Sequence, residues 1–150
     1  MKAILLAALL LSSSLAAAPI DDVKERFKGS HIKNADWIQK ADYQQAGHSD
    51  KYRILNVKLG HKEAMVKIDF TELEKDQLFA AEDYCLRLVD LTPLVLPQTW
   101  DETTPDQTAV SEVFTGTLEN GDSRKRVIKG WEFMRYRMEN TIYCSVKRGA

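Results

Sequence analysis

Sequence motifs that identify an enzyme are lacking in this chain. Its 150 residues include only two cysteines and no C-x-x-C pair, so thiol redox catalysis is not expected. A P-loop, a dinucleotide-binding glycine fingerprint and a G-x-S-x-G element are lacking as well. No motif therefore identifies a reaction, and we predict no catalytic residue.

Metal-binding patterns are also lacking. His31, His48 and His61 lie in unrelated segments, without the i, i+4 helical spacing or the short loop spacing of a metal site. The acidic residues near position 100 lack the alternating Asp/Asn loop with glycine that is typical of calcium sites. We therefore predict no metal and no cofactor.

The longest apolar run is too short to span a membrane. Residues 1–18, MKAILLAALLLSSSLAAA, place one charge, Lys2, before an apolar run at Ala3–Leu11 that serines then interrupt. A spanning helix needs about 20 apolar residues, whereas this layout is typical of a secretory signal peptide. We predict a signal peptide over 1–16 and a mature chain that begins at Ala17, with an uncleaved membrane anchor as the alternative. The mature chain is then periplasmic or secreted, without stable membrane insertion.

A large net charge is lacking too, since the whole chain carries −1. Together with export, this argues against a nucleic-acid partner. The charges are unevenly placed: residues 71–112 carry ten Asp/Glu and two Lys/Arg, and residues 121–150 carry eight Lys/Arg and three Asp/Glu. Either the two segments neutralise each other across the fold, or the second forms a basic face for an anionic envelope partner.

Both cysteines, Cys85 and Cys144, belong to the portion predicted to be exported. In an oxidising compartment a lone pair of cysteines normally forms a disulfide. The bridge would span 59 residues, which corresponds to about 4 kcal/mol of stability in the chain-entropy description. We predict a structural disulfide between these two residues.

The mature chain divides into a polar N-terminal segment, 17–50, and a β-rich domain, 51–150. In the first, Val23–Lys28 is predicted as a short helix that Gly29 ends, followed by irregular structure to residue 50. In the second, the clearest element is a hairpin over 52–70 with alternating apolar residues. Residues 72–83 fit either a helix or a strand, and further strands are predicted over 85–91, 111–118, 126–137 and 141–148.

These elements predict a mainly β fold. We expect a small antiparallel-rich sandwich or open barrel with a short N-terminal helix, and an α+β fold is the alternative. Trp131 and Phe133 are two residues apart and share one face of a strand, so we predict that they belong to the core. Stacking of these rings and of Tyr136 and Tyr143 on a sugar or polymer is the alternative.

A polar, proline-punctuated loop over 97–109 is the candidate binding site. Trp100 stands there in polar surroundings, and exposed aromatic residues on constrained loops are enriched among binding hot spots. Asp101, Glu102 and Asp106 would steer a basic partner toward it. The alternative is that Trp100 folds back and covers the open end of the sheet.

One stretch of the chain resembles a known family. Residues 108–137, TAVSEVFTGTLENGDSRKRVIKGWEFMRYR, and above all the segment Gly130-Trp131-Glu132-Phe133, resemble the small exported bacterial family catalogued as domain of unknown function 2155. The resemblance covers roughly residues 52–148. Cys85 and Cys144 come earlier than the cysteines of that family. The resemblance implies export and a β-rich fold, and no known activity.

These observations lead to three functional hypotheses. The first is an exported, non-enzymatic binding or accessory protein of the bacterial envelope, whose partner is another envelope or secreted protein. The second is an inhibitor or immunity protein that acts on a secreted hydrolase. The third is a hydrolase with a dispersed site.

Overall fold

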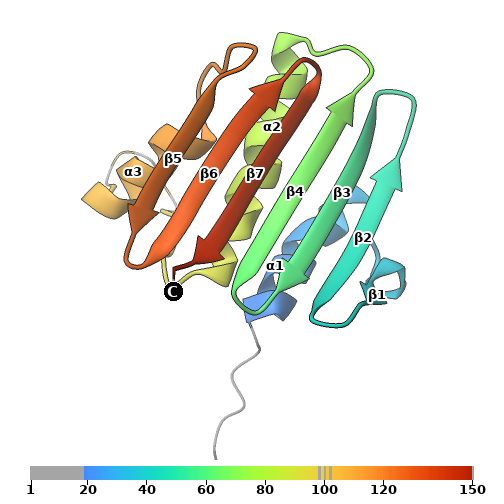
Figure 1. Cartoon of the computed structure of the whole chain (residues 1–150), viewed down its shortest axis with the longest axis horizontal. Helices are drawn as coiled ribbons and strands as arrows, with labels where there is room; N and C mark the ends of the chain where they lie inside the picture. Colours follow the sequence, from blue (N-terminus) through green and yellow to red (C-terminus); the bar gives the residue numbers. More distant parts are fainter. Residues whose placement is uncertain (1–18, 98, 100, 102, 150) are drawn as a thin grey trace, which may run out of the picture.

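A single seven-stranded antiparallel sheet, in the order β1-β2-β3-β4-β7-β6-β5, forms the framework of this computed structural model. The structure describes residues 19–97, 99, 101 and 103–149. Three α-helices lie on one face of the open sheet (Figure 1), which confirms the predicted fold class in its helix-covered, α+β form. The strands are β1 Ile38–Gln39, β2 Tyr43–Ser49, β3 Arg53–Gly60, β4 Glu63–Phe70, β5 Ser123–Ile128, β6 Trp131–Met138 and β7 Thr141–Arg148, and the helices are α1 Pro19–Phe27, α2 Lys75–Arg87 and α3 Pro105–Phe114.

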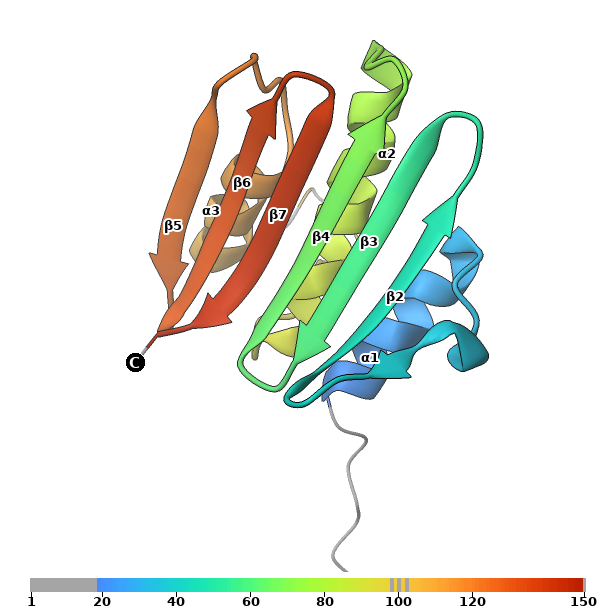
Figure 2. The ribbon, with the colours of Figure 1, turned by 45° about the vertical axis from the view of Figure 1, so that its right-hand side comes forward.

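The sheet consists of two three-stranded meanders and the short edge strand β1. The first comprises β2, β3 and β4, and the second comprises β5, β6 and β7, each in chain order. They meet where β4 pairs antiparallel with β7, the last strand of each meander. The two halves are therefore related by an approximate two-fold rotation about the centre of the sheet (Figure 2). An α-helix precedes each meander, α1 before the first and α3 before the second.

The core lies between the sheet and the helices. Side chains alternate between the two faces of a strand, and the residues that face the helices on β3, β4 and β7 are apolar and buried. The other face of the sheet carries no helix (Figures 1 and 2), as is common for antiparallel sheets. The buried strand residues are Leu55, Val57, Leu59, Ala64, Val66, Ile68, Phe70, Ile142, Cys144 and Val146.

Helix α1 buries one apolar stripe, Ile20, Val23 and Phe27, at the spacing of a helix face. It covers most of the predicted helix Val23–Lys28 and begins earlier. The prediction of irregular structure up to residue 50 is wrong for β2, which pairs along its whole length with β3. The polar composition of β2 hid the strand, because only Ala46 in it is buried.

Helix α2 answers the open question about residues 72–83 in favour of a helix and corrects the strand predicted over 85–91. Ala81, Tyr84, Cys85 and Leu88 are all buried, and their i, i+3, i+4, i+7 spacing is helical. The helix runs to Arg87 and continues as a 3₁₀ turn over Leu88–Leu91. The apolar run from 85 to 91 fits both periods when it is read without the residues before it.

Helix α3 corrects the strand predicted over 111–118. Its N-terminus carries a capping box, in which Thr104 accepts a hydrogen bond from the backbone of Gln107 and the Gln107 side chain accepts one from the backbone of Thr104. Pro105 follows at the first helical position, where its missing N–H costs nothing. This helix start lies inside the segment predicted as a loop over 97–109.

The C-terminal strands follow the prediction with one correction. Residues 141–148 form β7 as predicted. The strand predicted over 126–137 is instead divided into β5 and β6 by a two-residue turn, Lys129-Gly130, in which both residues have positive φ, 49° and 78°. Such a turn matches the twist of a hairpin, and Gly130 occupies a conformation that glycine adopts without strain.

Candidate functional site

The residues of the predicted binding loop are only partly described. Trp100 and Glu102 lie outside the described residues, so a binding role for Trp100 stays a prediction. Asp101 is exposed. Asp106 lies in the first turn of α3, and its carboxylate is 3.3 Å from the Nζ of Lys129 in the β5–β6 turn. Asp106 is therefore paired within the fold, which leaves it less able to steer a partner.

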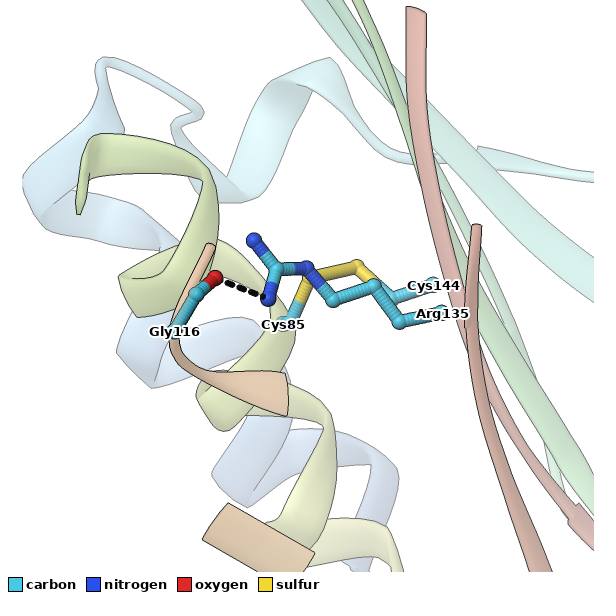
Figure 3. The surroundings of a disulfide bond; sticks show 4 residues. All are labelled: Cys85, Gly116, Arg135 and Cys144. Atoms are coloured by element: carbon cyan, nitrogen blue, oxygen red, sulfur yellow. Dashed lines mark hydrogen bonds between the residues drawn. A yellow bond between two sulfur atoms is a disulfide. The ribbon is translucent and has the colours of Figure 1, made fainter. Parts of the chain in front are cut away.

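The predicted disulfide between Cys85 and Cys144 is present, with an S–S distance of 2.08 Å and a Cα–Cα distance of 5.6 Å. Cys85 belongs to α2 and Cys144 to β7, and both are fully buried. The bridge therefore fastens the helical layer to a central strand of the sheet (Figure 3). Its position in the interior supports the predicted structural role.

A fully buried arginine lies beside the disulfide. Arg135 on β6 is the cross-strand neighbour of Cys144 and has no exposed surface. Its Nη1 donates a hydrogen bond of 3.0 Å to the Gly116 carbonyl (Figure 3), whereas its Nε and Nη2 have no hydrogen-bond partner among the described residues. Burial lowers the pKa of Arg135 to about 10, opposed by the nearby Glu82 carboxylate. The guanidinium is thus a buried cation that is only partly satisfied.

Arg135 is one of three arginines that bind the segment after α3. Arg124, Arg135 and Arg137, here called the arginine cluster, project from β5 and β6 toward the helices. Together they donate hydrogen bonds to four consecutive carbonyls, those of residues 115–118. Arg124 also donates to the Glu112 carbonyl in the last turn of α3, where cations are favourable.

This arrangement favours one of the two interpretations of the charge asymmetry. The acidic and basic segments pair with each other through Asp106 and Lys129, and through Glu112 and Arg126 at 2.9 Å. Three arginines of the basic segment are directed into the fold by carbonyl groups. These two ion pairs and the inward-directed arginines support the first interpretation, in which the two segments neutralise each other across the fold.

The uncovered face of the sheet carries the most prominent side-chain cluster. Tyr136 and Tyr143 are cross-strand neighbours with stacked rings whose centroids are 4.9 Å apart. The Tyr143 hydroxyl donates to the Met65 sulfur at 3.7 Å, and burial raises the pKa of Tyr143. Met65 and Met134 flank the buried Ser145 in the neighbouring row. We call Met65, Met134, Tyr136 and Tyr143 the tyrosine–methionine cluster.

A hollow of about 480 Å³ adjoins this cluster at the end of the β3–β4 hairpin. Met65 belongs to both, so the hollow and the cluster are continuous. Lys58 and Tyr43 both line the hollow, and the Nζ of Lys58 lies 5.3 Å from the ring centroid of Tyr43. Its lining residues are Asp42, Tyr43, Lys58, Gly60, His61, Lys62, Glu63 and Met65.

The charges around the cluster are largely paired with one another. Lys67 and Asp69 form an ion pair at 3.2 Å on β4, and Lys125 and Glu132 form another at 2.8 Å across β5 and β6. Both pairs lie on the uncovered face. The face therefore combines a half-buried aromatic and thioether centre with a nearly neutral rim.

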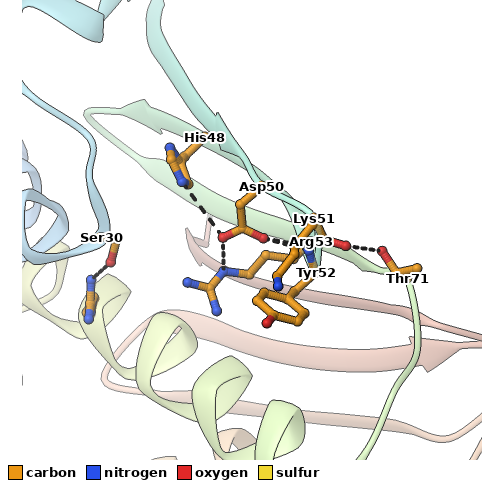
Figure 4. A network of polar contacts seen from close by, with 8 residues as sticks. Ser30, His48, Asp50, Lys51, Tyr52, Arg53 and Thr71 are labelled. Carbon is orange, nitrogen blue, oxygen red and sulfur yellow. Dashed lines mark hydrogen bonds and ion pairs between the residues drawn. The ribbon is translucent and has the colours of Figure 1, made fainter.

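A polar cluster lies at the turn of the β2–β3 hairpin, at the other end of β3 from the hollow. His48 Nε2 is 3.8 Å and Arg53 Nε is 3.9 Å from the same oxygen of Asp50 (Figure 4). The other Asp50 oxygen accepts backbone N–H groups of Tyr52 and Arg53, and these bonds, that of Tyr52 first, lower the pKa of Asp50. The ring of His31 lies 5.2 Å from that of His48, centroid to centroid.

Sequence reasoning placed Trp131 and Phe133 in the core, and both are buried there. It left Tyr136 and Tyr143 unassigned. The alternation of side chains along β6 could have shown that Tyr136 lies on the other face. Met134 and Tyr136 alternate with Trp131, Phe133 and Arg135 along this strand. The proximity of His31 and His48 has no such signal, since it arises from the packing of two separate segments.

Comparison with known proteins adds no assignment. No family model, curated protein or solved structure matches the chain. The resemblance of residues 108–137 to domain of unknown function 2155 stays a prediction. Among the described residues, no helix is long and apolar enough to cross a membrane, and no three His, Cys, Asp or Glu side chains are grouped as a metal centre.

Proposed function

We propose that this chain is an exported, non-enzymatic binding or accessory protein of the bacterial envelope, and that it binds another envelope or secreted protein on the uncovered face of its sheet. The observation that carries the proposal is the tyrosine–methionine cluster on that face. Tyrosine and methionine are enriched in the buried centres of protein interfaces. The disulfide supports a location outside the reducing cytoplasm.

The chemistry of the face indicates the kind of surface that fits it. Two of its lysines, Lys67 and Lys125, are paired with carboxylates, so a strongly charged partner gains little from them. The half-buried centre instead favours an apolar patch with a mixed polar rim. The adjoining hollow can take one protruding apolar side chain, because Tyr43 and Met65 supply apolar walls.

Site-specific photocrosslinking in the native envelope tests this proposal. A photoreactive phenylalanine analogue at Met134 reports on the uncovered face, and the same analogue at Phe79 is the control. Phe79 is 58% exposed on α2, in the helical layer. We expect one protein to be crosslinked reproducibly from Met134 and not from Phe79.

Matched substitutions separate binding from folding. Met134→Lys places an unpaired charge in the centre of the face and should abolish crosslinking from a neighbouring position such as Tyr136, while the thermal midpoint changes little. Phe79→Lys adds the same charge elsewhere and should leave crosslinking intact. Loss of the crosslink in Trp100→Ala alone, with Met134→Lys unaffected, would move the site to the 97–109 loop and overturn the proposal.

A further inference from the structure

Two histidines from separate segments face each other at one end of the sheet. His48 lies on β2, and His31 follows the 3₁₀ turn at Lys28–Ser30. Their ring centroids are 5.2 Å apart and the rings are tilted by 31°. Two imidazoles that share one tetrahedral metal ion, each with a metal–nitrogen distance of about 2.0–2.1 Å, have centroids on the order of 5 Å apart. The observed centroid separation therefore matches that of two imidazoles that share one ion.

The backbone holds His31 in place for this role. His31 has a positive φ of 64°, a conformation in which histidine is several-fold enriched among non-glycine residues. Its two neighbours are anchored, because Ile32 is fully buried and the buried Ser30 accepts a hydrogen bond from the Arg87 guanidinium. An unfavourable backbone conformation that the surroundings maintain is a common feature of functional positions.

Asp50 completes the surroundings of the pair. One of its oxygens is fixed by the backbone N–H groups of Tyr52 and Arg53, at 2.8 and 3.0 Å. The other oxygen is directed toward His48 Nε2 at 3.8 Å (Figure 4). Arg53 shares this oxygen at 3.9 Å, and its guanidinium carbon lies 5.5 Å from the ring centroid of Tyr84. Asp50 can thus orient His48, in competition with Arg53.

We propose that His31 and His48 form a two-imidazole site for a divalent transition-metal ion such as Zn²⁺, with Asp50 in support and water as the remaining ligands. Imidazole nitrogen suits Zn²⁺, Cu²⁺ and Ni²⁺, whereas Mg²⁺ and Ca²⁺ require oxygen ligands. Neither cysteine competes for the ion, since both belong to the disulfide. His31 is exposed and His48 half-buried, so the ion can enter from solvent.

Calorimetric titration of the exported chain with Zn²⁺ tests the proposal, using protein made without a polyhistidine tag. The third histidine, His61, lies in the β3–β4 turn and supplies a matched control. We expect one saturable Zn²⁺ site per chain, weakened at least about tenfold by His31→Ala or His48→Ala and changed less than about twofold by His61→Ala. Asp50→Asn should weaken binding less than either histidine change.

Nuclear magnetic resonance of the ring protons identifies the ligands independently. Zn²⁺ should shift the ring signals of His31 and His48 and leave those of His61 unchanged, and Mg²⁺ should shift none. Thermal unfolding of every variant in EDTA shows whether the fold is retained. Absence of a saturable site, or equal weakening by His61→Ala, contradicts the proposal.

Discussion

The two meanders of the sheet share one topology and differ in how they hold their helices. In the first, every residue of β4 that faces the helices is apolar, from Ala64 to Phe70, and all are buried. In the second, Arg124 and Arg126 on β5 and Arg135 and Arg137 on β6 occupy the corresponding face. The first half contacts its helices through apolar side chains. The second combines buried apolar side chains such as Phe133 and Val146 with hydrogen bonds from guanidinium groups to backbone carbonyls.

The difference shows what the basic C-terminal segment does. Segment 115–118, directly after α3, offers four carbonyls that no helix or strand satisfies. The arginine cluster donates hydrogen bonds to all four, so these main-chain acceptors are paired within the fold. A positively charged sequence segment can therefore serve folding, and its charge is not by itself evidence of an anionic partner.

The largest expected effect concerns the disulfide bond that connects the helical layer to the second meander. Replacing both cysteines, Cys85→Ala with Cys144→Ala, removes a crosslink that spans 59 residues. The chain-entropy description predicts a loss of about 4 kcal/mol in the free energy of unfolding, measured by denaturant titration. A loss below about 1 kcal/mol would mean that the contacts of α2 with β4 and β7 hold the layers together without the bridge.

A second pair of substitutions tests the arginine cluster itself. Arg124→Met removes charge-assisted hydrogen bonds to three carbonyls, those of Glu112, Thr115 and Thr117, and we expect a loss of about 2 kcal/mol. Arg135→Met removes one hydrogen bond and also a buried, partly unsatisfied charge. Apolar replacement of such a charge is often neutral, so we expect a change within about 1 kcal/mol.

We expect a larger loss of stability for Arg124→Met than for Arg135→Met. This order is informative because burial alone predicts the reverse. Arg135 has no exposed surface, whereas Arg124 is partly exposed. Denaturant unfolding of the two variants at pH 7 measures the difference directly. A larger loss for Arg135→Met than for Arg124→Met would show that Arg135 is fully paired in solution.

The same contrast explains how much of the fold the sequence predicts. In the first meander the strict alternation of Leu55, Val57 and Leu59 with polar residues predicts the hairpin over 52–70, and β3 and β4 are found there. In the second, the arginines on the covered face of β5 and β6 obscure which side is buried. The Lys129-Gly130 turn is then read as part of one long strand.

Helices proved harder to predict than strands for a related reason. The residues of 85–91 and 111–118 are short apolar runs that fit a period of 2 as well as 3.6. The helix start signals, above all Thr104-Pro105 with Gln107, lay in residues interpreted as a loop. The candidate sites depend on tertiary packing, because Tyr136 and Tyr143, like His31 and His48, meet only once the chain has folded.

The smallest expected effect concerns the β2–β3 turn of the first meander. There a carboxylate, that of Asp50, accepts hydrogen bonds from the backbone, whereas in the second meander arginines donate hydrogen bonds to it. The pKa of Asp50 is lowered by the backbone N–H of Tyr52 first, then by the N–H and guanidinium of Arg53 and by His48, while burial acts in the opposite direction. A lowered pKa means that the ionised form stabilises the fold. This stability is complete above the unfolded-state pKa of about 3.9 and is lost as pH falls through the folded-state value.

Asp50→Asn keeps an acceptor for the two N–H groups but removes the charge. We expect a loss below about 1 kcal/mol at pH 7, because hydrogen bonds to a charged acceptor are stronger than neutral ones and this site is partly exposed to solvent. The difference between the wild type and this variant should shrink as pH falls from about 5 to 3. Urea unfolding of both proteins across that range, in EDTA so that bound metal does not contribute, measures it. A difference that stays constant or grows on acidification would show that Asp50 acts only through the shape of the turn.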